Sequence, residues 1–265
     1  MDKVKSGNRE WLQLRNFSIR AFFVICFIIT WEVVSRLKIV NPLLFPAPSV
    51  VCSALIDWGL HGGLWGDVKA SFWRMLAGFI IGGFFGITFG MLTARVKFFT
   101  LSLSSTIQLL RPLPPVAIIP LVIVWLGIGD TAKIFSISFA VFFPVWINTH
   151  LGATSVSKVY LWSAQILCKS KLKTMFKVFI PATLPAIISG LRTSISIAFI
   201  MVYVSEIAGA SKGIGYQISV THLAYRIDQM MAALLVLAIA GALTDFLFAR
   251  FVRIVFPWTK LDDGK

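Results

Sequence analysis

Acidic residues, and charged residues in general, are scarce in this sequence of 265 residues. Asp and Glu number 11 and charged residues make up 14%, whereas an ordinary soluble domain contains roughly 25% charged residues. Hydrophobic residues account for 57% of the chain, more than a soluble domain of this length can hide in its interior. The composition therefore excludes an ordinary soluble globule and favours a chain that lies in a lipid bilayer.

Signatures of disulfide, nucleotide and metal chemistry are missing. The three cysteines, Cys26, Cys52 and Cys168, are an odd number in unlike segments and indicate no disulfide framework. No GxxxxGK[ST] phosphate loop occurs, and the three histidines stand apart from one another. We therefore expect no metal site, no cofactor and no enzymatic activity in this chain itself.

Long apolar runs repeat along almost the whole chain. Because an α-helix needs roughly 20 apolar residues to cross the hydrocarbon, we expect six transmembrane helices, at about 18–36, 72–94, 98–126, 133–154, 182–205 and 230–250. The prediction is an all-α polytopic membrane protein with one membrane domain over 21–256. A segment 1–20 precedes it, a tail 257–265 follows it, and an amphipathic piece at 49–60 lies at the membrane surface.

The basic residues are unevenly distributed among the connecting segments. The 25 Lys and Arg give a net charge of +14, which in a soluble protein would suggest nucleic acid. With a cytoplasmic N-terminus, 16 of them fall in cytoplasmic segments, six on the opposite side, and Arg74, Arg111 and Arg192 inside spans. This positive-inside pattern predicts that both termini are cytoplasmic and makes a nucleic-acid partner unnecessary.

The second span carries a glycine at every fourth position. Gly78, Gly82, Gly86 and Gly90 fall on one helix face, where another helix backbone can approach closely. We expect this ridge to serve packing rather than chemistry.

The third span is interrupted by prolines that follow a basic residue. Arg111 is followed by Pro112, Pro114, Pro115 and Pro120. Prolines break helices, and irregular backbone at membrane depth is tolerated where protein or a watery cavity surrounds it. Two readings stay open: a segment that lines a transport pathway, with Arg111 attracting an anion, or a structural kink at which Arg111 bonds the carbonyls freed by the prolines.

Ionisable residues within spans are few, and a charge at membrane depth tends to mark a pathway or a partner. Glu32 and Arg36 are four residues apart and predict a local helical pair. Arg192 can extend toward the cytoplasmic surface, and Asp245 has basic residues shortly after it. Glu206, at the outer edge of the fifth span, is a candidate pathway residue. These groups form no acidic relay of the kind a proton-coupled carrier uses.

The loop 155–177 is the most informative connecting segment. It contains five lysines and no acid, and Val159, Trp162 and Ile166 follow one another at helical spacing. The pattern indicates an amphipathic helix on the cytoplasmic side. Such a helix lies on lipid or docks in the groove of a partner protein, and the two alternatives are balanced on physical grounds.

This loop resembles the cytoplasmic loop of permease subunits of ATP-binding cassette (ABC) importers. Val178-Phe179-Ile180-Pro181 matches the family's Ile-x-Leu-Pro. Trp162-Ser163-Ala164 stands where the family has Glu-Ala-Ala, and Cys168 stands where it has glycine. The departures remove the carboxylate through which the family's loop contacts its ATPase.

Other segments resemble, in the same order, the permeases of the nitrate, sulfonate and taurine importer group. The likeness covers residues 41 to about 256. The segments are Phe45-Pro-Ala-Pro-Ser49, Leu110-Arg-Pro-Leu-Pro-Pro115, Ile119-Pro-Leu-Val-Ile-Val-Trp-Leu-Gly-Ile-Gly-Asp130, Ala132-Lys-Ile-Phe135, Phe142-Phe-Pro144, Asn148-Thr149 and Glu206-Ile-Ala-Gly-Ala-Ser-Lys-Gly-Ile-Gly-Tyr216.

The resemblance implies a type I ABC importer permease in a bacterial inner membrane. It implies cytoplasmic ATP-binding subunits, a second permease that is usually an identical copy, and a periplasmic or lipid-anchored solute-binding protein. The solute stays open among nitrate, bicarbonate, sulfonates, taurine and thiamine-precursor pyrimidines. The residues implied to couple the permease to its ATPase are Trp162, Ser163, Ala164, Ile166, Leu167, Cys168 and Ser170.

Two other functions remain as alternatives. A stand-alone secondary carrier would use an ion gradient, for which buried acids are scarce. A non-transporting membrane scaffold would agree with the altered loop motif.

Overall fold

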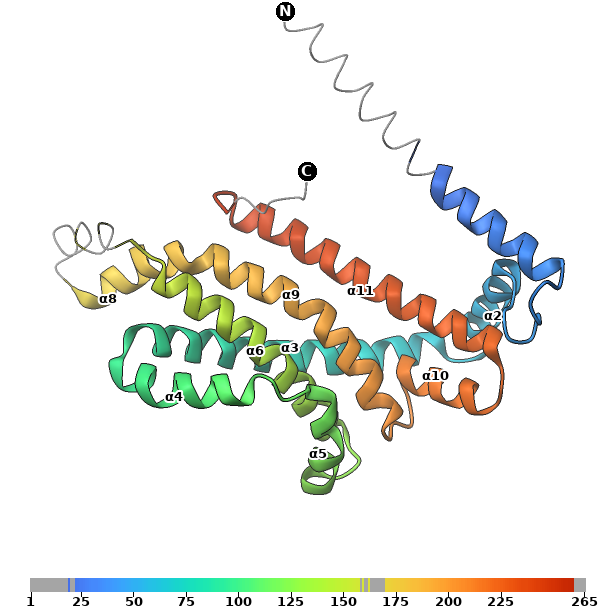
Figure 1. Ribbon diagram of the computed structural model, residues 1–265, viewed down its shortest axis with the longest axis horizontal. Helices are drawn as coiled ribbons and strands as arrows, with labels where there is room; N and C mark the ends of the chain where they lie inside the picture. The colour runs from blue at the N-terminus through green and yellow to red at the C-terminus, as the bar shows by residue number, and fades with distance from the viewer. Residues whose placement is uncertain (1–18, 20–21, 158, 160–161, 163–169, 260–265) are drawn as a thin grey trace, which may run out of the picture. The chain divides into compact units, whose positions relative to one another are not determined.

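The computed structural model describes residues 19, 22–157, 159, 162 and 170–259 (Figure 1). Over these residues the chain is helical and contains no strand, which confirms the all-α prediction. Contacts divide the chain into two compact units, Met1–Gly63 with Val220–Ala232, and Leu64–Ser219 with Ala233–Lys265.

The helices follow one another with short connections. In chain order they are a helix over 22–36, α2 (Pro48–His61), α3 (Leu64–Arg95), α4 (Lys97–Leu110), the 3-10 helix η1 (Pro115–Ile118), α5 (Ile119–Leu126), α6 (Asp130–Thr154), α8 (Lys171–Thr174), the π-helix η2 (Met175–Phe179), α9 (Ile180–Ile207), α10 (Ile214–Leu223) and α11 (Ile227–Val255).

Four helices in the described part of the chain are long and apolar enough to cross a membrane. They are α3, α6, α9 together with η2, and α11, and they confirm the second, fourth, fifth and sixth expected spans. The third expected span is a bent pair, in which α4 meets η1 and α5 at 88°. The first expected span begins among residues that the structure does not describe, and 22–36 of it are helical.

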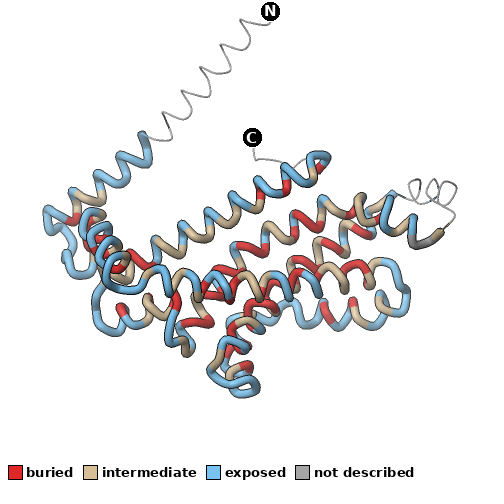
Figure 2. Tube along the Cα trace, turned by 180° about the vertical axis from the view of Figure 1, so that it is seen from behind, coloured by how far each residue is buried: buried red, intermediate tan, exposed pale blue. Residues whose placement is uncertain are grey.

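The core of the larger unit lies where α3, α6 and α9 run beside one another (Figure 1). Ile137, Val141 and Val145 of α6 and Ala198 and Val202 of α9 are fully enclosed there. Figure 2 shows buried positions gathered along these helices.

The glycine ridge of α3 is the surface against which α6 packs. A Cβ atom placed on Gly78 would lie 2.6 Å from Ile137 Cβ, and one on Gly86 would lie 2.8 Å from Val145 Cβ. Neither distance is possible for real carbon atoms, so only glycine permits this approach of the two helices. The predicted packing role of the ridge is confirmed.

In the smaller unit the helix over 22–36 is tied to the start of α2. The predicted Glu32–Arg36 pair is present. Glu32 also accepts hydrogen bonds from the Ser49 amide at 3.1 Å and from the Ser49 hydroxyl at 2.7 Å, and Ser35 Oγ donates to the Phe45 carbonyl at 2.7 Å. The segment expected to be amphipathic, 49–60, falls within α2 and is helical.

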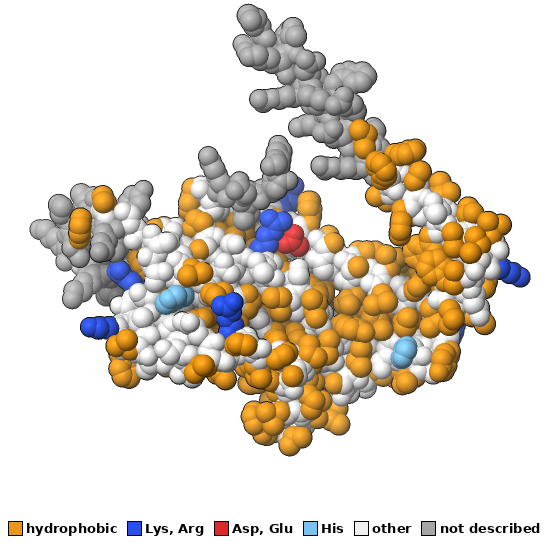
Figure 3. Space-filling view, viewed as in Figure 1, with side chains coloured by type: hydrophobic (Ala, Val, Ile, Leu, Met, Phe, Trp, Pro, Cys, Tyr) orange, Lys and Arg blue, Asp and Glu red, His pale blue; other side chains and the backbone are white. Residues whose placement is uncertain are grey.

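Helix α11 is the least enclosed of the four long spans. The most apolar 18-residue stretch of α11 is 11% buried, whereas the corresponding stretches of α3, α6 and α9 are 39%, 44% and 50% buried. Leu243, Leu247 and Phe251 each expose more than half of their surface. Hydrophobic side chains likewise cover much of the face in Figure 3, as expected where lipid or another membrane helix replaces water.

Candidate functional site

The basic loop between α6 and α9 is described in part. Val159 and Trp162 are both helical, with 62% and 61% of their surface exposed, and the Val159 amide donates to Ser157 Oγ at 3.3 Å. Two of the three residues of the expected apolar stripe thus lie on a helical segment and face outward. Ser170 is half-buried, and the other expected coupling residues, Ser163, Ala164, Ile166, Leu167 and Cys168, lie outside the described residues.

The C-terminal end of this loop is anchored in the larger unit. Phe179, the second residue of the Val-Phe-Ile-Pro segment, is fully buried and packs with Met91 of α3 and Ala153 of α6. The guanidinium of Arg95 lies 4.1 Å from the centre of the Phe179 ring, in a cation–π contact. A movement of the loop would therefore be transmitted to the ends of three spans.

Arg111 and the first two prolines at the break of the third span are exposed. Arg111 follows α4 directly, and its amide donates to the Ile107 carbonyl at 2.9 Å. Pro112 and Pro114 are exposed and Pro115 is half-buried. The prolines thus interrupt the helix as predicted, and Arg111 stands at the corner of the bend.

Glu206, the other candidate pathway residue, lies in a buried network where α9 ends. Its side chain has no exposed surface. Arg74 Nη1 donates to Glu206 Oε1 at 2.7 Å, Ser71 Oγ lies 2.9 Å from both carboxylate oxygens, and the Gly215 amide donates to Oε2 at 2.8 Å. Because both oxygens of the Glu206 carboxylate accept hydrogen bonds from neighbouring segments, this side chain holds those segments together.

Arg74 extends the network to two further segments. Its Nε donates to Asp130 Oδ1 at 2.8 Å, at the start of α6, and its Nη1 donates to the Lys212 carbonyl at 2.7 Å. Asp67 accepts the Gly213 amide at 2.8 Å. Gly213 has a φ of +133°, and a side chain there would strike the Glu206 carboxylate. One arginine thus joins α3, α6, α9 and the turn before α10.

Sequence reasoning placed Arg74 inside a span without assigning it a partner. Asp67, Ser71 and Arg74 follow one another at spacings of four and three on α3, which puts them on one helix face. That spacing predicts a polar helix face that points into the protein. It does not predict which acidic residues pair with Arg74.

A second ion pair joins α9 and α11. Arg192 Nε donates to Asp245 Oδ1 at 3.0 Å and Nη2 donates to Oδ2 at 3.1 Å. The two side chains are 35% and 37% exposed. Arg192 therefore pairs with an acid 53 residues away, on another helix.

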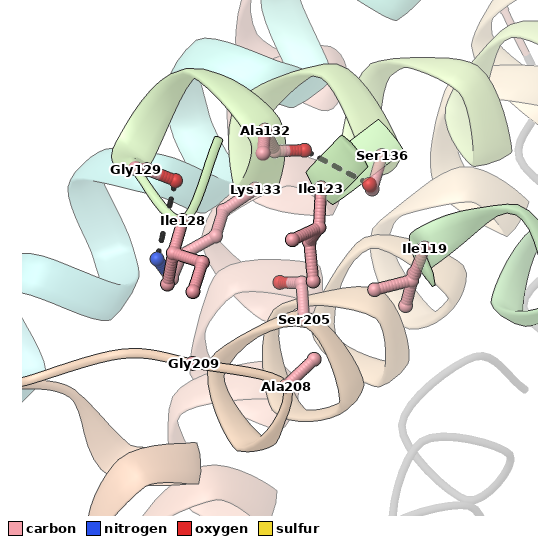
Figure 4. Close-up of a pocket in the computed structure, with 10 residues that line it drawn as sticks. All are labelled: Ile119, Ile123, Ile128, Gly129, Ala132, Lys133, Ser136, Ser205, Ala208 and Gly209. Carbon is pink, nitrogen blue, oxygen red and sulfur yellow. Dashed lines mark hydrogen bonds between the residues drawn. The ribbon is translucent and has the colours of Figure 1, made fainter. Parts of the chain in front are cut away.

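A small cavity lies between α5, the start of α6 and the end of α9 (Figure 4). Its volume is about 10 Å³, room for a single water molecule at most. Lys133 is 6% exposed and its Nζ donates to the Gly129 carbonyl at 3.1 Å. Ser136 and Ser205 add hydroxyl groups to an otherwise apolar wall. A cavity of this size does not admit an organic solute.

Several apolar spans and one sharply bent span together define a polytopic membrane protein. The sequence matches the family model described as "Binding-protein-dependent transport system inner membrane component" over residues 86–261. The chain belongs to this family, whose members are the permease subunits of binding-protein-dependent ABC importers and not themselves enzymes.

Curated relatives match along most of their length. A permease of Bacillus subtilis named for aliphatic sulfonate transport, SsuC, is 32% identical over 262 residues, which cover 99% of this chain and 94% of the relative. The taurine transport system permease protein TauC of Escherichia coli is 28% identical over 94% of this chain and 92% of its own. These matches confirm the predicted resemblance to the nitrate, sulfonate and taurine group.

Solved structures agree on the fold. An inward-facing structure of the methionine ABC transporter MetNI matches with a TM-score of 0.60 and 20% identity, over 74% of this chain and 98% of its own. An amino acid ABC transporter matches with a TM-score of 0.55 and 17% identity, over 77% and 92% of the two chains. The expected type I importer permease fold is confirmed.

Proposed function

We propose that this permease carries a small sulfonate across the membrane, in the class of taurine and short alkanesulfonates. The observation that carries the proposal is the near full-length match to two relatives named for aliphatic sulfonates and for taurine. The exposed Arg111 at the bend of the third span supports an anionic solute. Of the solutes open from the sequence, nitrate and bicarbonate share the negative charge, whereas a pyrimidine does not.

ATP hydrolysis takes place in separate cytoplasmic subunits that bind the loop 155–177. The exposed Trp162, the lysines of the loop and the anchoring of Phe179 under Arg95 support this assignment. ATP binding moves the loop helix, and the buried Phe179 passes the movement to α3, α6 and α9. The residues proposed to form the contact are Trp162, Ser163, Ala164, Ile166, Leu167, Cys168 and Ser170.

Two further partners complete the complex. A second copy of this chain forms the other half of the permease, and the exposed apolar surface of the spans supports such an association. A periplasmic or lipid-anchored binding protein delivers the solute to the outer side. Both termini lie in the cytoplasm, as the excess of Lys and Arg in the segments on that side supports.

The solute class is tested by stimulation of ATP hydrolysis in the assembled complex. The complex is reconstituted in nanodiscs with its ATP-binding subunits and binding protein, and taurine, butanesulfonate, nitrate, bicarbonate and a hydroxymethylpyrimidine are added in turn. We expect taurine or butanesulfonate to raise the hydrolysis rate and the pyrimidine to leave it unchanged. Stimulation by nitrate, bicarbonate or the pyrimidine but by neither sulfonate would overturn the proposed solute.

A further inference from the structure

Helix α9 carries a polar stripe on the side that it does not bury. Ser189, Thr193 and Ser196 are exposed and Arg192 is partly exposed. Their spacing of three or four residues places them on one face of the helix over two turns. An exposed polar stripe is unusual on a membrane-spanning helix, because side chains that face lipid are normally apolar.

The opposite side of α9 accounts for its packing. Ile195, Ala198 and Val202 belong to the core shared with α3 and α6. The polar stripe is therefore not required for the contact of α9 with these helices. The Thr193 hydroxyl donates to the Ser189 carbonyl of the same helix at 3.0 Å, so the charged Arg192 is the member of the stripe that most needs water or a polar partner.

Arg192, a member of this stripe, pairs with Asp245 of α11 well inside both helices. Arg192 is 12 residues after the start of α9 at Ile180 and 15 before its end at Ile207. Asp245 is 18 residues after the start of α11 and 10 before its end at Val255. Both charges are thus more than two helical turns from either end of their helix.

This pair differs in its exposure from the Arg74–Glu206 pair, which lies where α9 ends. Arg74 and Glu206 expose 7% and 0% of their side chains, as suits a permanent brace. Arg192 and Asp245 expose 35% and 37%. Charges that stay accessible at this depth belong where water enters the protein, since lipid would leave them poorly solvated.

We propose that the stripe Ser189–Ser196 of α9 lines the aqueous pathway, and that Arg192 is the group that contacts the anionic solute during passage. The inference rests on the proposed function and names the residues that meet the solute. Arg192 forms a two-point contact with the carboxylate of Asp245, and the oxygens of a sulfonate offer the guanidinium the same two-point geometry.

Asp245 is the counter-ion of the empty pathway. It neutralises and orients the guanidinium when no solute is present, and the sulfonate replaces it as the solute passes. Competition with Asp245 keeps the contact weak, which a transport site requires because the solute must leave as readily as it enters.

The first test compares variants of the two charges in the full complex with its ATP-binding subunits and binding protein, reconstituted in liposomes. Arg192→Gln removes the anion contact and should lower taurine uptake roughly tenfold to a hundredfold. Arg192→Lys should retain part of the uptake. Asp245→Asn should lower uptake less than Arg192→Gln does and should tighten solute binding, because Arg192 remains without its competing carboxylate. Arg250→Gln, an exposed arginine near the end of α11, is the matched control and should behave as wild type.

A brace between α9 and α11 would give another pattern. It would make Arg192→Gln and Asp245→Asn equally damaging, with a similar fall in melting temperature for both. That result, or unchanged uptake in Arg192→Gln, would overturn the inference.

The second test measures water access without depending on transport. Ser196→Cys and Ile239→Cys are each treated with the anionic reagent sulfonatoethyl methanethiosulfonate. The labelling of the native cysteines is measured in the unsubstituted protein and subtracted. Ile239 lies on the exposed apolar side of α11 and serves as the lipid-facing control. We expect Ser196→Cys to react at least about tenfold faster, because the reagent needs water and a thiolate. Equal rates would overturn the pathway assignment.

The two tests separate failure of the inference from failure of the proposed function. A wild-type complex that carries no sulfonate while Ser196→Cys reacts rapidly would contradict the solute class and retain the water-lined stripe. Sulfonate uptake with Arg192→Gln at the wild-type rate would retain the solute class and contradict the role of Arg192.

Discussion

Arg74 on α3 and Glu206 on α9 are 132 residues apart in sequence, and their side chains meet at 2.7 Å in the interior of the larger unit. The two charges expose 7% and 0% of their side chains. The remaining hydrogen-bond partners of these two side chains are Ser71, Gly215, Asp130 and the Lys212 carbonyl. The pair ties together three membrane spans and the turn that leads to α10.

Removal of Arg74 should therefore destabilise the fold severely. Arg74→Leu leaves the Glu206 carboxylate buried without its counter-charge, which costs about 3–5 kcal/mol. We expect a large fall in the melting temperature of the detergent-purified protein. Arg36→Leu removes an arginine whose side chain is 70% exposed, and this control should change the melting temperature little. Equal melting temperatures for Arg74→Leu and Arg36→Leu would contradict the bracing role.

The glycine ridge provides a matched pair of substitutions within one helix. A Cβ on Gly86 would lie 2.8 Å from Val145 Cβ, whereas a Cβ on Gly83 would lie 3.2 Å from Leu191 Cδ2, the movable end of a side chain. Gly86→Ala forces α3 and α6 apart at a cost of about 1–3 kcal/mol, and Gly83→Ala should be tolerated. Thermal unfolding of the two variants checks this, and a Gly83→Ala variant as unstable as Gly86→Ala would disprove the packing account.

Trp162 is expected to matter for coupling and not for folding. Its side chain is 61% exposed on the basic loop, so Trp162→Ala loses little internal packing. In the reconstituted complex we expect solute-stimulated ATP hydrolysis to fall severalfold, because a large exposed aromatic is a frequent anchor of protein interfaces. Membrane insertion should be unchanged.

A second exposed tryptophan controls for the loss of an aromatic side chain. Trp125 on α5 is 67% exposed and lies outside the loop, so Trp125→Ala should leave coupling intact. Full stimulation of hydrolysis by solute in Trp162→Ala would remove this residue from the docking surface. Leu167→Asp, in the same loop, should also reduce coupling, because it places a charge on the surface proposed to dock.

Arg111 provides a separate test of the bend in the third span. If the exposed guanidinium attracts the anion toward the pathway, Arg111→Gln should lower taurine uptake, and Arg111→Lys should restore much of it because the charge is retained. The loss should also shrink as ionic strength rises, since salt screens an attraction between exposed charges. Unchanged uptake in Arg111→Gln at low salt would leave Arg111 as a structural residue of the kink.

Much of the fold could be predicted because membrane thickness fixes the length of an apolar helix. The runs that became α3, α6, α9 and α11 were found for that reason, and each helix extends beyond its expected span by a few residues into polar flanks. The glycine ridge and the proline break were also readable, because each depends on the chemistry of a single residue type.

The ion pairs of Arg74 and Arg192 were not predictable in the same way. Arg74 meets acids that lie 56 and 132 residues away, and Arg192 meets one that lies 53 away. Helical spacing shows which side chains share a face, but it does not show which face of another helix will lie opposite. For Asp245 the sequence shows basic residues shortly after it, but it does not show that Arg192 of α9 lies opposite.

As proposed above, this chain moves its solute only together with ATP-binding subunits. The most direct measurement is the initial rate of taurine uptake into liposomes that contain the permease, with and without those subunits, supplied with ATP or with an imposed proton gradient. We predict uptake only when the ATP-binding subunits, the binding protein and ATP are all present. Uptake by the permease alone under a proton gradient would contradict the account and identify a secondary carrier instead.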